Sequence, residues 1–271
     1  MFCYLSLKSK PFVILAGVSG TGKSKLVRLF AEAVGATVSN GQFKMISVKP
    51  DWNDSTELFG YKNIAGDFIP GQLTSIILEA VKPENKNKPY FVCLDEMNLA
   101  RVEYYLSDYL SLIESREFKG EEIITDKLYP KDYHGESSPY KDLYLTDNLY
   151  LIGTVNMDDN TYAFSRKVLD RANTIEFSQV YLEDLNFDVS GEARQIVQNN
   201  DFLKTRFLNI SEALAEYEED VKATNEKVIE INNMSKQKLP VSVMTSGVVP
   251  LSTGAKICQI KFITLPSYLL Y

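Results

Sequence analysis

Runs of apolar residues alternate with amphipathic stretches along the chain as far as residue 177. Continuous apolar runs bounded by polar residues are typical of strands buried on both faces of a parallel sheet, and they occur at 12–16 and 90–94. Residues 148–154 predict a further strand. An alternating run at 44–48 predicts another strand, and 174–177 predicts a strand that closes the sheet. Strands that alternate with helical patterns predict an α/β fold with a parallel sheet.

Apolar positions at helical spacing lie between these runs and predict helices. The predicted helices span 25–34, 72–81, 102–113 and 165–171. A further short helix should begin at Ser55, because Asp54 and Glu57 are spaced as in a capping box. Helices between parallel strands are expected to cover the faces of the sheet.

Two regions have no clean periodicity. Residues 117–147 are rich in charge, tyrosine, glycine and proline, and they predict a β-hairpin insertion or a long loop with His134 exposed on it. Trp52 and Phe59 lie near Pro50 and Gly60, and the sequence is compatible with two environments for their side chains. Either they face a substrate from a loop, or they pack into the core.

The segment between the first predicted strand and the first predicted helix fits the phosphate-binding pattern G-x-x-x-x-G-K-[ST]. It consists of Gly17, Val18, Ser19, Gly20, Thr21, Gly22, Lys23 and Ser24. The glycines allow a tight turn that aims backbone N–H groups at phosphate oxygens, and the helix N-terminus adds the positive end of a dipole. Lys23 can reach the β- and γ-phosphates, and the Ser24 hydroxyl can hold Mg²⁺.

Two other structures could contain similar glycines at this point of the chain. A glycine-rich turn before an ordinary helix would show the same glycines, but here strand, loop and helix all match the nucleotide-binding pattern. A dinucleotide fingerprint would need a third glycine where Lys25 stands, so that pattern fails.

The apolar run at 90–94 ends in two acids, Asp95 and Glu96. A carboxylate at the end of a strand beside a P-loop can hold Mg²⁺ directly or through water. The next carboxylate can act as general base toward an attacking water. A solvated acidic turn is the plain alternative, and the P-loop upstream weighs against it.

Polar residues also follow the strand predicted at 148–154. Asn156 can hydrogen-bond a γ-phosphate or orient a water molecule. Asp158 and Asp159 come next, and adjacent acids of this kind are ordinarily turn formers. The helix predicted at 165–171 carries two arginines, Arg166 and Arg171.

Composition adds few constraints. The net charge of −7 gives no electrostatic argument for nucleic-acid binding by the chain as a whole. The three cysteines and the single histidine are too far apart in sequence for a metal-ligand pattern. An odd number of cysteines without a secretory signal predicts a reducing, cytoplasmic location, and no apolar run is long enough to span a membrane.

The P-loop, the Asp95–Glu96 pair, Asn156 and the late arginines occur in the order of an AAA+ NTPase. The chain resembles the McrB-like branch of the dynein-related and MoxR-like AAA ATPases, which includes the motor of methylation-dependent restriction systems. Residues 93–103 resemble the DEMNLARVE element of that branch, and residues 153–159 resemble its sensor-1 and signature loop. Residues 50–61 resemble its helix-2 insertion, and 117–147 its pre-sensor hairpin. The similarity covers about 5–180, weakens toward 231 and is absent beyond.

The resemblance implies a role for each site residue. Phosphate is bound by the P-loop with Lys23, Mg²⁺ by Ser24 and Asp95, and the attacking water is activated by Glu96. Asn156 is implied as sensor 1, Asp159 as the signature acid that helps to position the water, Arg171 as an arginine finger in trans, and Arg166 as the second finger candidate. The signature here is Asn-Met-Asp-Asp where the best-known motor has Asn-Thr-Ala-Asp, so ATP and GTP both stay open.

The fold implied is a P-loop αβα sandwich with a parallel sheet, followed by a partial helical lid. We therefore expect a nucleotide-binding domain at 1–180, an incomplete lid at 181–232, and a divergent, poorly ordered tail at 233–271. No acid follows Glu230, and no arginine follows Arg206 that could serve as sensor 2.

Two functions follow from the resemblance. The first is a homo-oligomeric ring motor that hydrolyses ATP or GTP with Mg²⁺, acts with a separately encoded nuclease, and contacts DNA only indirectly or through another domain. The second is a nucleotide-gated interaction module, or a truncated remnant, with little turnover. Glu96 and Arg171 favour the motor, and the missing sensor-2 region favours the module.

Overall fold

The computed structural model describes residues 2–119, 122–130, 133–135, 138–157, 161–177, 199–205 and seven residues between 218 and 229. The chain forms two compact units, Met1–Lys204 and Thr205–Tyr271. In the second unit the residues 218–219, 222–223, 226–227 and 229 are helical, and Lys222 pairs with Glu218 at 2.5 Å. Most of the predicted lid and the whole predicted tail at 233–271 lie outside the described residues.

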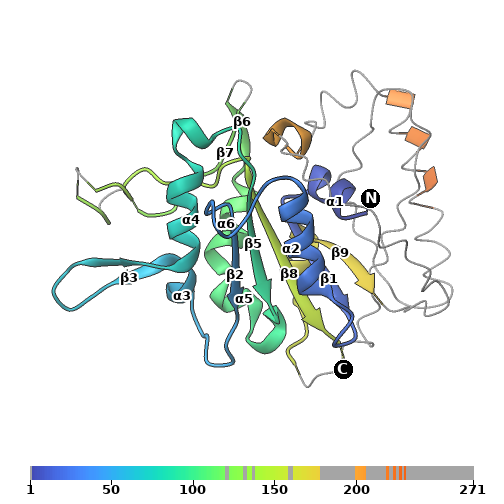
Figure 1. Ribbon diagram of the computed structural model, residues 1–271, viewed down its shortest axis with the longest axis horizontal. Helices are drawn as coiled ribbons and strands as arrows, with labels where there is room; N and C mark the ends of the chain where they lie inside the picture. Colours follow the sequence, from blue (N-terminus) through green and yellow to red (C-terminus); the bar gives the residue numbers. More distant parts are fainter. Residues whose placement is uncertain are drawn as a thin grey trace. The chain divides into compact units, whose positions relative to one another are not determined.

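The first unit is built on a parallel five-stranded sheet with the order β2-β5-β8-β1-β9 (Figure 1). The strands are β1 (Phe12–Gly17), β2 (Phe43–Ser47), β5 (Tyr90–Asp95), β8 (Leu149–Asn156) and β9 (Asn173–Phe177). All five were predicted from the sequence, β2 from its alternating run and the central strands from their apolar runs, and the α/β fold class is confirmed. β8 lies between β1 and β5 and pairs with both, from Phe12 opposite Leu151 and from Tyr90 opposite Leu149.

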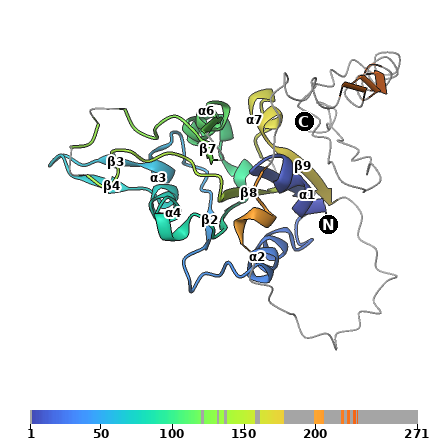
Figure 2. The ribbon, with the colours of Figure 1, turned by 90° about the horizontal axis from the view of Figure 1, so that it is seen from above.

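The central strands are buried because helices cover both faces of the sheet (Figure 2). Val13 and Leu15 of β1 pack against α1 (Phe2–Ser9) and α2 (Lys23–Ala33). Phe12 and Ile14 point to the other face, because successive residues of a strand alternate. Helix α1 was not expected from the sequence; its Leu7 is fully buried.

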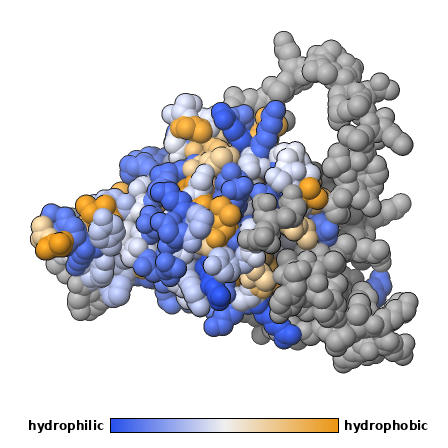
Figure 3. Space-filling model, turned by 90° about the horizontal axis from the view of Figure 1, so that it is seen from below, coloured by the Kyte–Doolittle hydropathy of each residue, from blue (hydrophilic) through white to orange (hydrophobic). Residues whose placement is uncertain are grey.

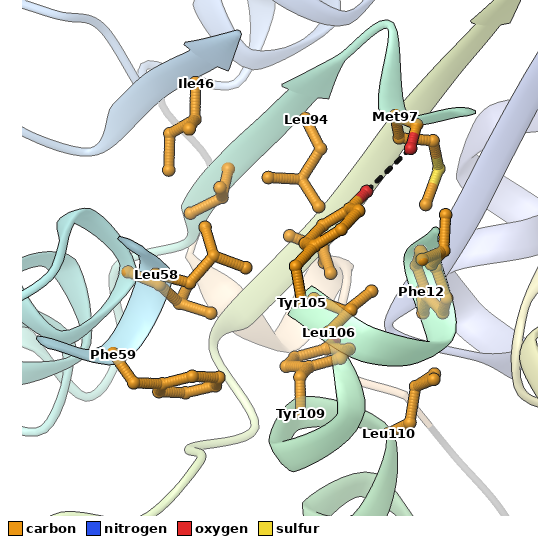
Figure 4. Packing of buried hydrophobic residues seen from close by; sticks show 14 of the residues in the cluster. Phe12, Ile46, Leu58, Phe59, Leu94, Met97, Tyr105, Leu106, Tyr109 and Leu110 are labelled. Atoms are coloured by element: carbon orange, nitrogen blue, oxygen red, sulfur yellow. Dashed lines mark hydrogen bonds between the residues drawn. The ribbon is translucent and has the colours of Figure 1, made fainter. Parts of the chain in front are cut away.

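The second face is covered by α4 (Gln72–Ala80), α5 (Val102–Tyr105), α6 (Ser107–Glu114) and α7 (Arg166–Arg171). The single helix expected at 102–113 is interrupted at Leu106, which is itself fully buried. In this core the Tyr105 hydroxyl donates a hydrogen bond to the carbonyl of Met97 at 2.8 Å (Figure 4). Met97 belongs to a short 3₁₀ turn, η2 (Met97–Leu99), that follows β5; the other two 3₁₀ turns are η1 (Pro83–Asn85) and η3 (Asn200–Phe202).

An insertion between β2 and α4 holds α3 (Thr56–Phe59) and the antiparallel strands β3 (Gly60–Lys62) and β4 (Phe68–Pro70). Trp52 and Phe59 are buried at its base, so they belong to the core. The β3–β4 hairpin was not predicted. Gly60 has φ 95°, and a Cβ there would lie 2.2 Å from the Ile69 carbonyl oxygen, so this turn requires glycine.

The insertion predicted at 117–147 contains the expected hairpin, formed by β6 (Glu117–Lys119) and β7 (Glu122–Ile124). The prediction that His134 is exposed was wrong, because its side chain is buried. The imidazole packs edge-on against the rings of Phe68, Tyr129 and Tyr133. A polar, aperiodic segment can therefore still bury its aromatic residues against a neighbouring hairpin.

Among the described residues, no helix is long and apolar enough to cross a membrane.

Candidate functional site

The P-loop connects the end of β1 to the start of α2. Gly20 and Gly22 have φ angles of 77° and 79°, in the left-handed region that favours glycine. Gly17 packs against β9 so closely that a Cβ would lie 2.4 Å from the Phe177 carbonyl oxygen. Glycine is therefore required for two different reasons. Gly20 and Gly22 adopt the left-handed backbone of the turn, and Gly17 has no side chain that would clash with β9.

Lys23 is the first residue of α2, and its side chain is buried. Its ammonium group donates to the carbonyl oxygens of Gly17 at 3.0 Å and Val18 at 2.7 Å, and to the Thr21 hydroxyl at 3.3 Å. The positive charge consequently lies inside the curve of the loop, where a P-loop lysine is needed to reach phosphate.

Ser24 and Asp95 meet at the carboxyl edge of the sheet. The Ser24 hydroxyl donates to Asp95 Oδ1 at 2.5 Å, and the Thr154 hydroxyl donates to the same oxygen at 2.6 Å. Hydroxyl and carboxylate oxygens are the ligands that Mg²⁺ prefers, so the donor set of Ser24 and Asp95 fits this ion.

Glu96 has an unusual backbone conformation. With φ 53°, it is the only non-glycine residue in the described part of the chain with a positive φ. Its N–H donates to the Thr154 hydroxyl at 3.0 Å, which helps to hold this conformation. Strained backbone of this kind is common at functional sites and persists when its surroundings hold it.

The Glu96 carboxylate is in turn held by Asn156. The Asn156 amide nitrogen donates to Glu96 Oε1 at 3.0 Å. Because β8 lies between β1 and β5, both Thr154 and Asn156 reach the acids of β5 from the adjacent strand. The strand order thus brings together five residues singled out in the sequence: Lys23, Ser24, Asp95, Glu96 and Asn156.

Sequence reasoning missed Thr154. The signal was its place two residues before Asn156 on the same strand, which puts both side chains on one face. Because β8 is apolar until it ends in Thr154 and Asn156, both polar side chains could have been assigned to the site at the carboxyl edge of the sheet.

The two arginines lie on α7. Arg166 is exposed, whereas the Arg171 side chain is 17 % exposed and forms an ion pair with Glu114 of α6. Arg171 also donates to the Lys167 carbonyl at 2.5 Å, and its hydrogen bond lowers the pKa of the Glu114 carboxyl. Among the described residues, the Arg171 side chain thus bonds to Glu114 of α6 and to Lys167 of its own helix, and not to the five residues above. Asp159 lies outside the described residues.

A parallel sheet with a P-loop after β1, and with acids at the end of β5, which β8 separates from β1, defines a P-loop αβα nucleotide-binding fold. The family model of the AAA domain (dynein-related subfamily) matches residues 12–172. The chain belongs to this family. AAA domains are typically nucleoside triphosphatases that use Mg²⁺, and they commonly assemble into rings.

Other comparisons add little. A search of curated proteins found no match. Solved structures that match include the crystal structure of NtrX from Brucella abortus, with 14% identity and a TM-score of 0.37. The match covers 64% of this chain and 35% of that chain, so this chain corresponds to about a third of that protein's length.

Proposed function

We propose that this AAA domain binds ATP or GTP with Mg²⁺ and hydrolyses the bond between the β- and γ-phosphates. The observation that carries the proposal is the hydrogen bond, 3.0 Å long, between Asn156 at the end of β8, the strand next to the P-loop strand, and Glu96, which directly follows β5. A carboxylate held in place beside a phosphate-binding loop is suited to act as a general base.

Each residue has a stated task in this reaction. The P-loop N–H groups and Lys23 bind the phosphates and offset their charge. Ser24 and Asp95 would hold Mg²⁺, which when bound supplies further positive charge at the β- and γ-phosphate oxygens. Glu96 accepts a proton from water as the water oxygen bonds to the γ-phosphorus. The bond from that phosphorus to the bridging oxygen breaks, and the nucleoside diphosphate leaves with the electron pair.

Phosphate release from ATP and from GTP tests this proposal. Glu96→Gln should bind nucleotide as the parent does and slow turnover by roughly 10²–10⁴-fold, the usual contribution of a positioned base. Glu84→Gln is the matched control, because this glutamate is exposed on η1 and should leave turnover unchanged. Turnover of Glu96→Gln within threefold of the parent, at equal nucleotide binding, would reject Glu96 as the base.

We further propose that the chain is a subunit of an oligomeric motor in a McrB-like restriction or defence system. The support is the resemblance of residues 93–103 and 153–159 to that branch, together with the arginines of α7. A separately encoded nuclease would perform any cleavage. Light scattering with and without nucleotide, and turnover with and without DNA, test this part. A monomer that hydrolyses nucleotide at full rate would contradict it.

The second candidate is a nucleotide-gated interaction module with little turnover. The observation that favours it is the ion pair of Arg171 with Glu114 within one chain, which occupies the implied arginine finger. Binding of ATP or GTP with turnover no faster than that of Glu96→Gln would support this candidate over the motor.

A further inference from the structure

Asn98 lies in η2, two residues after Glu96, and is 3% exposed. A buried amide nitrogen needs hydrogen-bond acceptors to offset the cost of removing it from water. The partners of this amide show which parts of the site it connects.

The Asn98 amide nitrogen donates to the backbone carbonyl of Asn156 at 3.0 Å and to the Thr161 hydroxyl at 2.6 Å. A carbonyl oxygen can only accept, so the nitrogen of the amide and not its oxygen must face Asn156. The Asn98 side chain therefore holds the peptide of the residue whose own amide holds Glu96.

The same turn also fixes the segment that follows β8. The Asn98 backbone carbonyl accepts from the N–H of Tyr162 at 3.0 Å. The Arg101 guanidinium lies 5.1 Å from the centre of the Tyr162 ring, within range for a cation–π contact. Residues 161–162 are thus fastened to the loop after β5, and they lead into α7 with its two arginines.

We propose that Asn98 is a positioning residue for hydrolysis, an inference that rests on the proposed function. By fixing the Asn156 peptide, it sets the direction of the Asn156 side chain and hence the place of the Glu96 carboxylate. Small displacements of a reacting group are costly, and about 1 Å can lower a rate by about 10²-fold.

Asn173 provides a matched comparison within the same chain. It is 5% exposed, and its amide nitrogen donates to the Ser6 carbonyl at 2.9 Å and the Ser9 hydroxyl at 2.6 Å. Asn98 and Asn173 thus each donate to one carbonyl and one hydroxyl. Only Asn98 has a partner in the site, namely Asn156, since the partners of Asn173 connect β9 to the end of α1.

The experiment compares Asn98→Leu with Asn173→Leu in the full chain, using whichever of ATP and GTP the parent hydrolyses faster. Asn98→Leu should lower kcat by about 10- to 100-fold and leave KM within about threefold, since the interaction serves the transition state. Affinity for the nucleoside diphosphate with aluminium fluoride, a transition-state mimic, should fall by a similar factor. Asn173→Leu should lower the unfolding midpoint with kcat unchanged.

Several outcomes would overturn the proposal. They are an unchanged kcat for Asn98→Leu, a KM that rises as much as kcat falls, or an equal loss of kcat in Asn173→Leu. Asn98→Asp, which keeps the shape and loses the donor, decides the question if the leucine variant fails to fold. Asn98→Ala, which removes the whole amide and hence the donor to the Asn156 carbonyl, decides it if both other position-98 variants fail to fold, and an unchanged kcat there rejects the role. A parent chain without turnover would instead reject the proposed function itself.

Discussion

Two regions of the first unit are held together by different physical means. At the carboxyl edge of the sheet, successive hydrogen bonds connect five residues in the order Ser24, Asp95, Thr154, Glu96 and Asn156. Around the β3–β4 hairpin, aromatic rings pack against one another with little hydrogen bonding between their side chains. The first region depends on particular hydrogen-bond donors and acceptors, and the second depends on how well the aromatic side chains fit together.

The second region, which we call the aromatic cluster, consists of Phe68, Tyr129, Tyr133, His134 and Tyr140. The ring of Phe68 lies 4.6 to 6.0 Å from the other four ring centres. Figure 2 shows the hairpin beside the segment that precedes β8. The hairpin carries apolar surface among polar residues (Figure 3): Ile64 in its turn is fully exposed, and Ile69 of β4 is 42% exposed.

The largest expected effect tests whether the first region is the nucleotide site. Lys23→Ala removes a buried ammonium group from the P-loop, and binding of a fluorescent ATP or GTP analogue should weaken by roughly 100-fold or more. Lys25→Ala, an exposed neighbour on the same helix, is the control and should bind normally. If Lys23→Ala bound the nucleotide analogue as tightly as the parent, residues 17–24 would not be the phosphate-binding loop. The first region would then not be the nucleotide site.

The next effect asks whether α7 belongs to the site. If Arg171 acts in trans, Arg171→Ala should lower turnover by roughly 10- to 10³-fold and leave nucleotide binding intact. Mixing it with Glu96→Gln should restore part of the activity at mixed interfaces. Glu114→Gln breaks the ion pair and keeps the arginine, so it should not lose turnover. Equal losses in Arg171→Ala and Glu114→Gln would show that the pair is structural, and Arg166→Ala would then test the other candidate.

A smaller effect is expected at the base of the aromatic cluster. The Tyr129 hydroxyl donates to the Phe59 carbonyl at 2.6 Å and lies 2.7 Å from the Thr74 hydroxyl. Tyr129→Phe leaves the carbonyl with one partner fewer, so the free energy of unfolding should fall by about 0.5–1.5 kcal/mol in urea titrations. Nucleotide affinity should not change, and Tyr133→Phe is the control that removes a hydroxyl elsewhere in the cluster. A weakened affinity would show that the two regions are coupled.

The smallest effect concerns pH. Burial lowers the pKa of His134, and the Lys62 ammonium lowers it further. The unfolded chain therefore binds more protons than the folded chain between the two pKa values, so stability rises with pH there. The contribution is complete above the ordinary histidine pKa of about 6.5 and is lost as pH falls through the lower folded value.

His134→Phe isolates that contribution, because the chain has a single histidine. The difference in urea midpoint between parent and variant should change as pH falls from 7.5 to 5.5, with the parent losing more stability. A constant difference would mean that His134 titrates alike in the folded and unfolded chains.

The contrast between the regions also explains what the sequence could predict. The central strands and the P-loop were predictable because a buried parallel strand is an apolar run and phosphate binding needs a fixed spacing of glycines. The edge strand β2 was predictable from its alternating run. The β3–β4 hairpin was missed because its strands have only three residues each, too few for a periodic pattern.

The burial of His134 was missed for a different reason. Phe68 and His134 come from two different insertions, and neither insertion has a regular spacing of apolar residues. A local sequence pattern therefore could not show that Phe68 packs on His134. Thr154 and Asn98 were missed because each acts through a partner about sixty residues away in sequence. Their roles depend on strand order, which no local window contains.

The position of β8 also bears on how the chain folds. β1 and β2 are synthesised early and β5 soon after, but β1 has no sheet neighbour among them and must wait for β8. Pairings between distant segments form slowly, because a long loop must close before they contribute. The P-loop and the acids that follow it in the site therefore come together only when β8 is inserted between β1 and β5, and nucleotide can stabilise only chains that have completed this step.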